Sequence, residues 1–159
     1  MHGGEEAEFS DESSKPDGTL LFGRVTYQQM ASFWPTEQAK QMFAKTAENM
    51  TRSPKIVFSR TLTDPGWENV TVVREDAVAA VRRLKETSDR DMTVLGSGSI
   101  VTQLADAGLI DAYQIMLDPV ALGAGRTVFA GISRKLNLRL TSTRTFKSGV
   151  LLLNYENAT

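Results

Sequence analysis

The sequence predicts an α/β domain with a central, mixed but mostly parallel sheet, helices on both faces and an antiparallel hairpin at the end. Two observations predict this class. Short apolar runs that stop at glycine, serine or proline alternate with longer segments whose apolar residues recur at helical spacing. Near the end of the chain, two apolar stretches instead flank a Lys147-Ser148-Gly149 turn, with no helical segment between them. At 159 residues, the chain has the length of one domain with its own core.

The first half of the chain is expected to hold three strands and two helices after a polar N-terminal segment, residues 1–17, that reads as a loop or weak helix. Pro35 should stop the first of these helices, and Thr36 is a typical N-cap for the second. In chain order, the elements are strand 19–22, which ends at Gly23, helices 24–34 and 37–50, and strands 55–58 and 70–73.

The second half continues the alternation and then changes character. A helix with apolar residues from Ala77 to Leu84 is followed by strand 92–95 and by a helix that begins near Gly98. Gly108 lies just past that helix, where a left-handed C-cap favours glycine. Strand 111–117, loop 118–125 and hairpin strands 136–140 and 150–155 complete a domain that we expect to span residues 18–157.

The composition excludes several kinds of chemistry. A net charge of −1 argues against electrostatic binding to nucleic acid, and no apolar run approaches the ~20 residues of a membrane span. There is no cysteine and one histidine, His2, so thiolate catalysis, Ser-His-Asp catalysis and Cys- or His-based metal sites lack their parts. We therefore expect no metal, and chemistry carried by a bound cofactor or by carboxylates, hydroxyls, lysine or arginine. Without a signal peptide at the N-terminus, a cytoplasmic location is expected.

Three expected strand ends carry residues suited to bind a ligand: Gly23-Arg24-Val25-Thr26, Ser59-Arg60-Thr61 and Gly96-Ser97-Gly98-Ser99. Ligands of open α/β sheets bind outside the carboxyl ends of the strands, so these turns can converge. They offer two helix N-termini, hydroxyl donors and two guanidiniums, which suits an elongated ligand with several phosphates. The alternatives are that Gly-Ser-Gly is only a tight connection and that both arginines are solvated surface residues.

The motifs around these turns occur in a specific order: Leu-Leu-Phe-Gly-Arg-Val-Thr-Tyr (20–27), Ile-Val-Phe-Ser-Arg-Thr-Leu (56–62), Val-Leu-Gly-Ser-Gly-Ser (94–99) and Asp-Pro-Val-Ala-Leu-Gly-Ala-Gly-Arg-Thr-Val-Phe (118–129). With them, the sequence resembles the dihydrofolate-reductase-like family, and within it the reductase domain of the bifunctional riboflavin-biosynthesis deaminase/reductase and its stand-alone bacterial relatives. The resemblance runs from about Gly18 to Tyr155. It implies a three-layer reductase fold that uses NADPH.

The resemblance also implies residue roles. Gly23, Arg24 and Thr26 would hold the cofactor phosphates, and Ser59, Arg60 and Thr61 the adenosine ribose with its 2′-phosphate. The pyrophosphate and nicotinamide ribose would be wrapped by Gly96, Ser97, Gly98, Ser99 and Ile100, and the substrate pocket bordered by the 118–125 loop with Asp118 and Gly123. Apart from the resemblance, Tyr27 could line the substrate pocket, although it is equally suited to packing within its helix. Two arginines with no clear ribose-binding acid also favour NADP over NAD. The expected reaction resembles that of dihydrofolate reductase or 5-amino-6-(5-phosphoribosylamino)uracil reductase: hydride transfer to a small heterocyclic (pteridine- or aminopyrimidine-like), carbonyl or imine substrate.

One departure from the family affects the N-terminal region. Family members usually begin with a strand that runs into a Ser-Leu-Asp-Gly segment, and nothing before Gly18 matches it. Without that strand, a gap would expose backbone groups and core surface, unless a partner chain fills it or the sequence starts late. The exposed sheet predicts a homodimer. The alternative functions are a non-catalytic NADP-binding or sensing module and a domain that binds no cofactor and serves assembly.

Overall fold

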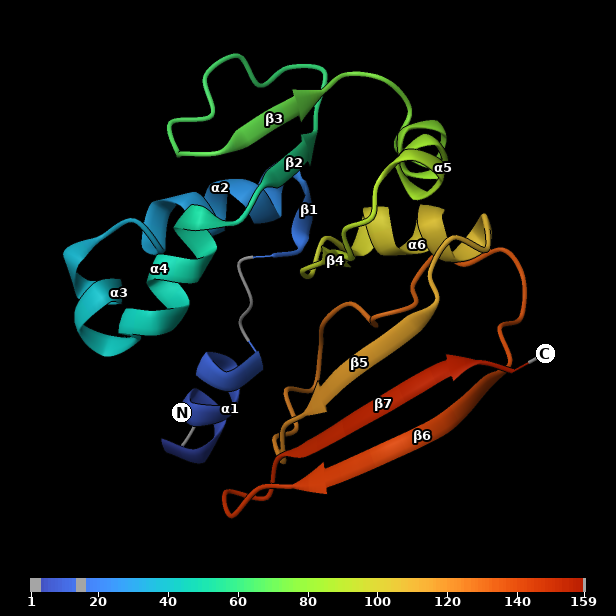
Figure 1. Ribbon diagram of the computed structural model, residues 1–159. Helices are drawn as coiled ribbons and strands as arrows, with labels where there is room; N and C mark the ends of the chain where they lie inside the picture. Colours follow the sequence, from blue (N-terminus) through green and yellow to red (C-terminus); the bar gives the residue numbers. More distant parts are fainter. Residues whose placement is uncertain (1–3, 14–16, 159) are drawn as a thin grey trace.

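The computed structural model describes residues 4–13 and 17–158, which form helices and strands in the predicted alternation (Figure 1). The elements fall into two groups: strands followed by helices as far as α6, and strands alone after it. In chain order they are α1 (Gly4–Ser13), β1 (Thr19–Gly23), α2 (Arg24–Phe33), α3 (Glu37–Met42), α4 (Ala44–Arg52), β2 (Lys55–Phe58), β3 (Val70–Val73), α5 (Ala77–Thr87), β4 (Met92–Val94), α6 (Gly98–Asp106), β5 (Ala112–Leu117), β6 (Leu138–Thr145) and β7 (Leu151–Asn157).

The first four strands form a parallel sheet in the order β3-β2-β1-β4, with helices on both faces (Figure 1). On one face, α5 and α6 cover a core that contains Leu21, Ala80 and Leu104. On the other face, α2 and α4 cover a core that contains Phe22 and Val57. Side chains of neighbouring residues in β1 point to opposite faces, which is why the short apolar strand serves both cores. The α/β class and the helical layers are as the sequence predicts.

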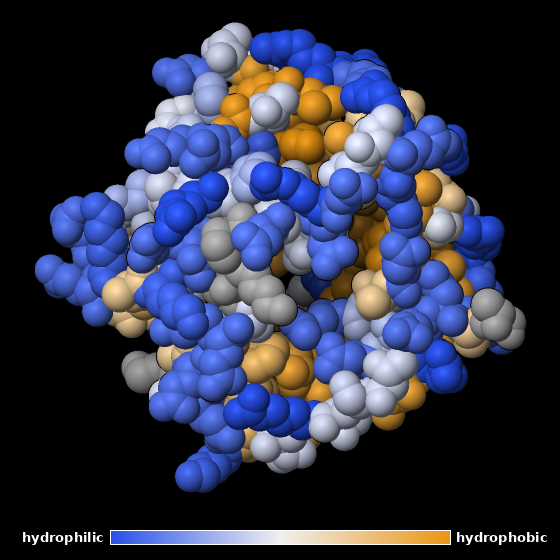
Figure 2. Space-filling model, viewed as in Figure 1, coloured by the Kyte–Doolittle hydropathy of each residue, from blue (hydrophilic) through white to orange (hydrophobic). Residues whose placement is uncertain are grey.

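The last three strands form a separate antiparallel sheet in the order β5-β7-β6, which contains the predicted hairpin. Strand β6 begins later and ends later than the expected 136–140, and its register shifts between Leu140 and Ser142. Among the described residues, no strand pairing joins β4 to β5, so the strands expected in one central sheet are divided between two. The face seen in Figure 2 is hollowed near its centre, in the region between β4 and β5 in Figure 1.

Two local predictions have different outcomes. The side chain of Thr36 accepts the backbone N–H of Ala39 at 3.2 Å, as expected of an N-cap. The single helix expected over residues 37–50 is wrong, because the chain leaves helical geometry at Phe43 (φ −143°, ψ 60°) and restarts as α4. Phe43 packs its ring edge-on against Trp34, at 6.0 Å between centroids, which accounts for an interruption that apolar spacing does not reveal.

The polar N-terminal segment contains a helix, α1, which contacts both the β6–β7 turn and helix α4. Phe9 packs edge-on against Phe146 of the β6–β7 turn, with ring centroids 5.8 Å apart, and Glu6 is buried and accepts a hydrogen bond from Ser148. At the other end of α1, Asp11 accepts the backbone N–H of Thr46 in α4 at 3.0 Å. Acidic sequences are usually solvated, so the composition gave no sign of this packing. His2 lies outside the described residues.

Candidate functional site

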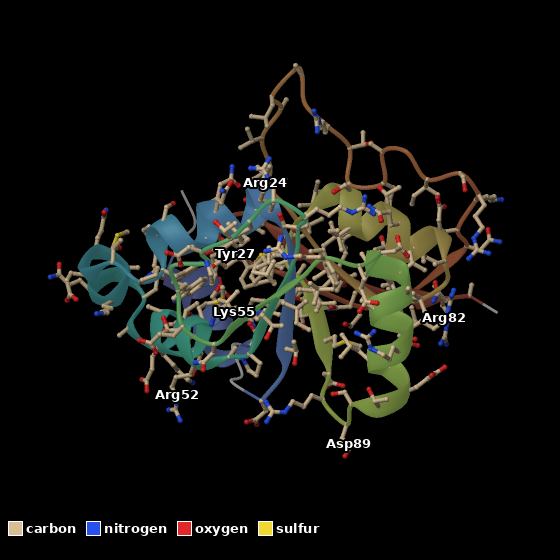
Figure 3. All side chains as sticks on the ribbon, turned by 90° about the horizontal axis from the view of Figure 1, so that it is seen from above. Arg24, Tyr27, Arg52, Lys55, Arg82 and Asp89 are labelled. Atoms are coloured by element: carbon tan, nitrogen blue, oxygen red, sulfur yellow. The ribbon has the colours of Figure 1, made fainter. Side chains whose placement is uncertain are left out.

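The carboxyl ends of β2, β1 and β4 form one edge of the parallel sheet, and the three predicted turns follow these strands. Since β1 lies between β2 and β4, the turn at Gly23 has the turn at Ser59 on one side and the turn at Gly96 on the other. In Figure 3, Arg24 lies at this edge, whereas Asp89, shortly before β4, lies at the opposite end of the sheet. The three turns therefore share one rim of the molecule.

Ser97 joins the first turn to the third. Its hydroxyl accepts the backbone N–H of Gly23 at 2.9 Å, and its own N–H donates to the Thr26 hydroxyl at 3.2 Å. Ser97 is buried and lies in the left-handed region (φ 53°), a conformation that non-glycine residues seldom adopt. A side chain at Gly23 would lie 3.4 Å from Cγ1 of Ile100. Gly23, Thr26 and Ser97 therefore bring the first and third turns together.

Replacing Ser97 with alanine is expected to lower the free energy of unfolding by about 1–2 kcal/mol, because the Gly23 N–H loses its acceptor in a partly buried position. Urea denaturation measures the change. Ser99→Ala is the matched control: Ser99 is exposed, and its substitution should change stability by less than about 0.5 kcal/mol. Equal effects of the two substitutions would show that the bond between the turns contributes nothing.

The N-termini of α2 and α6 meet at this rim without side-chain caps. Gly23 caps α2 and Ser97 caps α6, and neither provides a side-chain hydrogen bond to its helix. Within the part of the chain that the structure describes, the backbone N–H groups of Gly98 and Ser99 have no protein acceptor. Apart from the chain neighbours of Gly98 and the backbone of its own helix, no atom lies within 4 Å of the position that a Cβ of Gly98 would take. Free N–H groups at two helix N-termini with open space beside them form a place for anionic oxygens.

The side-chain hydroxyl of Ser59 holds the turn after β2 in place. Ser59 Oγ accepts the backbone N–H groups of Thr61 and Leu62 at 3.2 and 3.1 Å. The exposed Arg60 side chain makes no hydrogen bond or ion pair with any described residue. In the neighbouring turn, Arg24 donates to Gln28 one helical turn away at 3.3 Å. Both guanidiniums are therefore exposed at the rim, as an anion site requires, while Ser59 organises its own turn.

Three of the predicted site residues, Tyr27, Ser97 and Ile100, are buried. Tyr27 is 1% exposed and packs between Phe22 and Trp67, and its hydroxyl donates to the carbonyl of Pro65 at 2.6 Å. Burial raises the pKa of the Tyr27 hydroxyl above its usual value of 10.0, with Asp64 adding to the shift. The burial of Tyr27 favours its packing role, and its substrate-side role stays a prediction. Ile100 is also buried, and its N–H donates to Ser97 O at 2.8 Å in the first turn of α6. Its cofactor-side role stays a prediction.

The loop after β5 extends from the side of the molecule on which Arg24 lies (Figure 3). Asp118 and Gly123 are exposed in this loop, and Gly123 has a positive φ of 74° that favours glycine. Their substrate-side roles stay predictions.

Two hollows lie away from the three turns. One of about 470 Å³ is lined by Pro35, Trp67 and neighbouring residues, and one of about 280 Å³ by Gly108, Arg134 and neighbouring residues. Neither is lined by a predicted site residue. Within residues 4–13 and 17–158, no three His, Cys, Asp or Glu side chains gather as a metal site would require, and no helix is long and apolar enough to cross a membrane.

Comparison with known proteins identifies the family. Residues 1–152 match the family described as the RibD C-terminal domain. The chain belongs to this family. Membership of the RibD C-terminal domain family supports a reductase-type role for the protein. Among curated proteins, YyaP of Bacillus subtilis (strain 168) is 27% identical over 138 residues, which are 87% of this chain and 73% of YyaP. YwjB of the same organism is 29% identical over 134 residues, 84% of this chain and 71% of YwjB.

Solved structures share the fold of this RibD C-terminal domain. A riboflavin-biosynthesis-like protein of Shewanella sp. PV-4 superposes with a TM-score of 0.70 at 22% identity, covering 100% of this chain and 81% of that one. RibD of Acinetobacter baumannii gives a TM-score of 0.68 at 12% identity, and the chain covers 52% of it. At these identities the likeness concerns the fold alone.

Proposed function

We propose that this RibD C-terminal domain is an NADPH-dependent reductase that transfers hydride to a small heterocyclic, carbonyl or imine substrate, with pteridine- or aminopyrimidine-like compounds as the first candidates. The observation that carries the proposal is the meeting of two helix N-termini without side-chain caps at one sheet edge, with Arg24 and Arg60 exposed in the adjoining turns. The donors at this rim are all cationic or neutral, which suits a ligand with several phosphates.

Different residues of the rim suit different parts of NADPH. The N–H groups of Gly98 and Ser99 and the guanidinium of Arg24 would hold the pyrophosphate, and Arg60 would hold the 2′-phosphate of the adenosine ribose. Thr61 and Gly96 are exposed on either side of Gly23 and would contact the two riboses. When bound, NADPH supplies the hydride, so the protein needs no nucleophile of its own.

The substrate would lie on the side of the loop after β5. Asp118 is the candidate proton donor, with water as the alternative, and Gly123 would let the loop approach the substrate closely. The protein's remaining task is to hold the donor and acceptor carbons about 3–3.5 Å apart.

Loss of NADPH absorbance in the presence of a panel of pteridines and ribosylaminopyrimidines tests the proposal. Oxidation of NADPH that depends on one of these substrates would support it. Binding of NADPH without turnover by any of them would instead favour a non-catalytic NADP-binding or sensing module. Calorimetric titration without heat of binding at millimolar NADPH or NADP would favour a role in assembly alone.

We also propose that the protein forms a homodimer through the antiparallel sheet. Ile115 pairs with Leu153 across β5 and β7, and Leu117 pairs with Leu151, so their side chains share one face. Leu117 and Leu140 are 54% and 50% exposed there. Apolar sheet surface of this kind is typical of an interface. Sedimentation equilibrium should give a dimer mass that Leu117→Glu reduces to the monomer mass, and a monomer in the unsubstituted protein would refute the proposal.

A further inference from the structure

Arg74, directly after β3, binds the turn that carries Arg60. One guanidinium nitrogen donates to the Arg60 carbonyl at 2.7 Å, and the other terminal nitrogen donates to the Leu62 carbonyl at 3.0 Å. Arg74 is far from this turn in sequence, and the motifs of the chain do not single it out. The contact arises because β2 and β3 are parallel neighbours, so that their carboxyl ends lie side by side.

With Arg74 in place, the polar backbone groups of the turn are held from two sides. Ser59 Oγ accepts the N–H groups of Thr61 and Leu62, while Arg74 binds the carbonyls of Arg60 and Leu62. The N–H of Ser59 extends the parallel ladder by donating to Val73 O at 3.0 Å. The backbone of Arg60 is therefore fixed relative to β3, and its side chain is the part of the residue that remains unbound.

We propose that Arg74 is a positioning residue that sets the selectivity for NADPH over NADH by holding the turn in the conformation that presents Arg60 to the 2′-phosphate. The inference rests on the proposed function of the rim. A guanidinium suits this task because its planar fork reaches two carbonyls at once. A lysine ammonium, as a single point donor on a flexible stem, would not hold both.

Arg74 and Arg60 have different roles in this proposal. Arg60 would contact the phosphate, whereas both terminal nitrogens of Arg74 already donate to backbone carbonyls. Loss of Arg74 should therefore matter only when Arg60 is present, because the role of Arg74 is exerted through it. Coupling of this kind appears in a double-mutant cycle as a departure from additivity.

The dissociation constants of NADPH and NADH, measured by titration calorimetry, test the inference in the full-length protein. We expect Arg74→Ala to weaken NADPH binding about fivefold to tenfold and NADH binding less than about twofold. Arg74→Lys should show a similar loss, and Arg74→Ala should reduce selectivity no further in an Arg60→Ala background. Amide hydrogen exchange at Thr61 and Leu62, followed in the protein without cofactor, should become faster in Arg74→Ala.

Two results would overturn the inference. Equal weakening of both cofactors would show that Arg74 has only a structural role, and a further loss of NADPH selectivity in the Arg60→Ala background would show direct contact with the phosphate. Arg52→Ala is the matched control, because Arg52 is also exposed, forms an ion pair with Glu48 and lies on the side of the molecule away from Arg24 (Figure 3). It should leave both affinities unchanged.

Failure of the proposed function gives a different pattern. If the unsubstituted protein binds neither cofactor, or binds both equally, the cofactor assignment and the role of Arg74 fall together. If it prefers NADPH and Arg74→Ala keeps the same preference, only the role of Arg74 is refuted.

Discussion

Replacing Lys55 with methionine is expected to lower the free energy of unfolding by about 3 kcal/mol. Lys55 is 1% exposed, and its ammonium donates to the carbonyls of Met50, Thr51 and Ser53 at 2.7–2.9 Å, at the end of α4. The same nitrogen lies 4.4 Å from the centroid of the Trp67 ring. Methionine would fill the space but leave carbonyls without their donor at a helix C-terminus, where a cation is favoured. Urea denaturation of the two proteins measures the difference.

Lys45→Met is the control for this substitution, since Lys45 is an exposed lysine on the same helix. Its stability should stay within about 0.5 kcal/mol of the unsubstituted protein. A loss of similar size in both variants would mean that the buried hydrogen bonds of Lys55 contribute little.

The stability that depends on Lys55 should also change with pH. Burial lowers the pKa of the Lys55 ammonium from 10.5 to about 8, and Glu68 opposes the shift. Between pH 8 and pH 10.5, Lys55 is protonated in the unfolded chain but largely neutral in the folded one. The unfolded chain therefore binds more protons there, and the free energy of unfolding rises with pH. The difference in stability between the unsubstituted protein and Lys55→Met should therefore widen from pH 8 to pH 10.5. A constant difference across this range would contradict the assignment.

Patterns local in sequence predicted most of the first sheet. Strands β2 and β3 have the predicted bounds, and the glycine and serine residues that end the strands mark the rim. Each of these features depends on a few neighbouring residues: an apolar run, a cap or a turn. The convergence of the turns followed from a general property of parallel sheets rather than from any one motif.

Contacts between distant segments could not be predicted in the same way. Ser97 reads as an exposed phosphate ligand, yet it is buried because its hydroxyl serves Gly23, far away in the chain. Tyr27 reads equally as pocket or core, and its packing against Trp67 favours the core. Arg74 carries no motif, and only the pairing of β2 with β3 brings it to its turn. Local sequence patterns predict the sheet edge at which a site can form. Which side chains are exposed at that edge depends on packing between segments that are distant in the sequence.

Replacing Arg60 with alanine is expected to weaken NADPH binding tenfold to a hundredfold and NADH binding less than about threefold. A charge-assisted, bidentate pair with a phosphate contributes about 1.5–3 kcal/mol, and NADH has no phosphate at that position. Arg60 is exposed and makes no ion pair within the described parts of the chain, so the substitution removes no contact of the fold. Fluorescence titration with both cofactors measures the two losses.

Arg24→Ala provides the matched contrast within the same rim. Arg24 would meet the pyrophosphate, which NADPH and NADH share, so its loss should weaken both cofactors by the same factor. Arg24 and Arg60 are both exposed, yet only the loss of Arg60 should reduce the preference for NADPH over NADH. Equal losses of NADPH and NADH in Arg60→Ala would remove the 2′-phosphate assignment. Equal losses in Arg24→Ala are what the shared pyrophosphate requires, because a group common to both ligands cannot distinguish them.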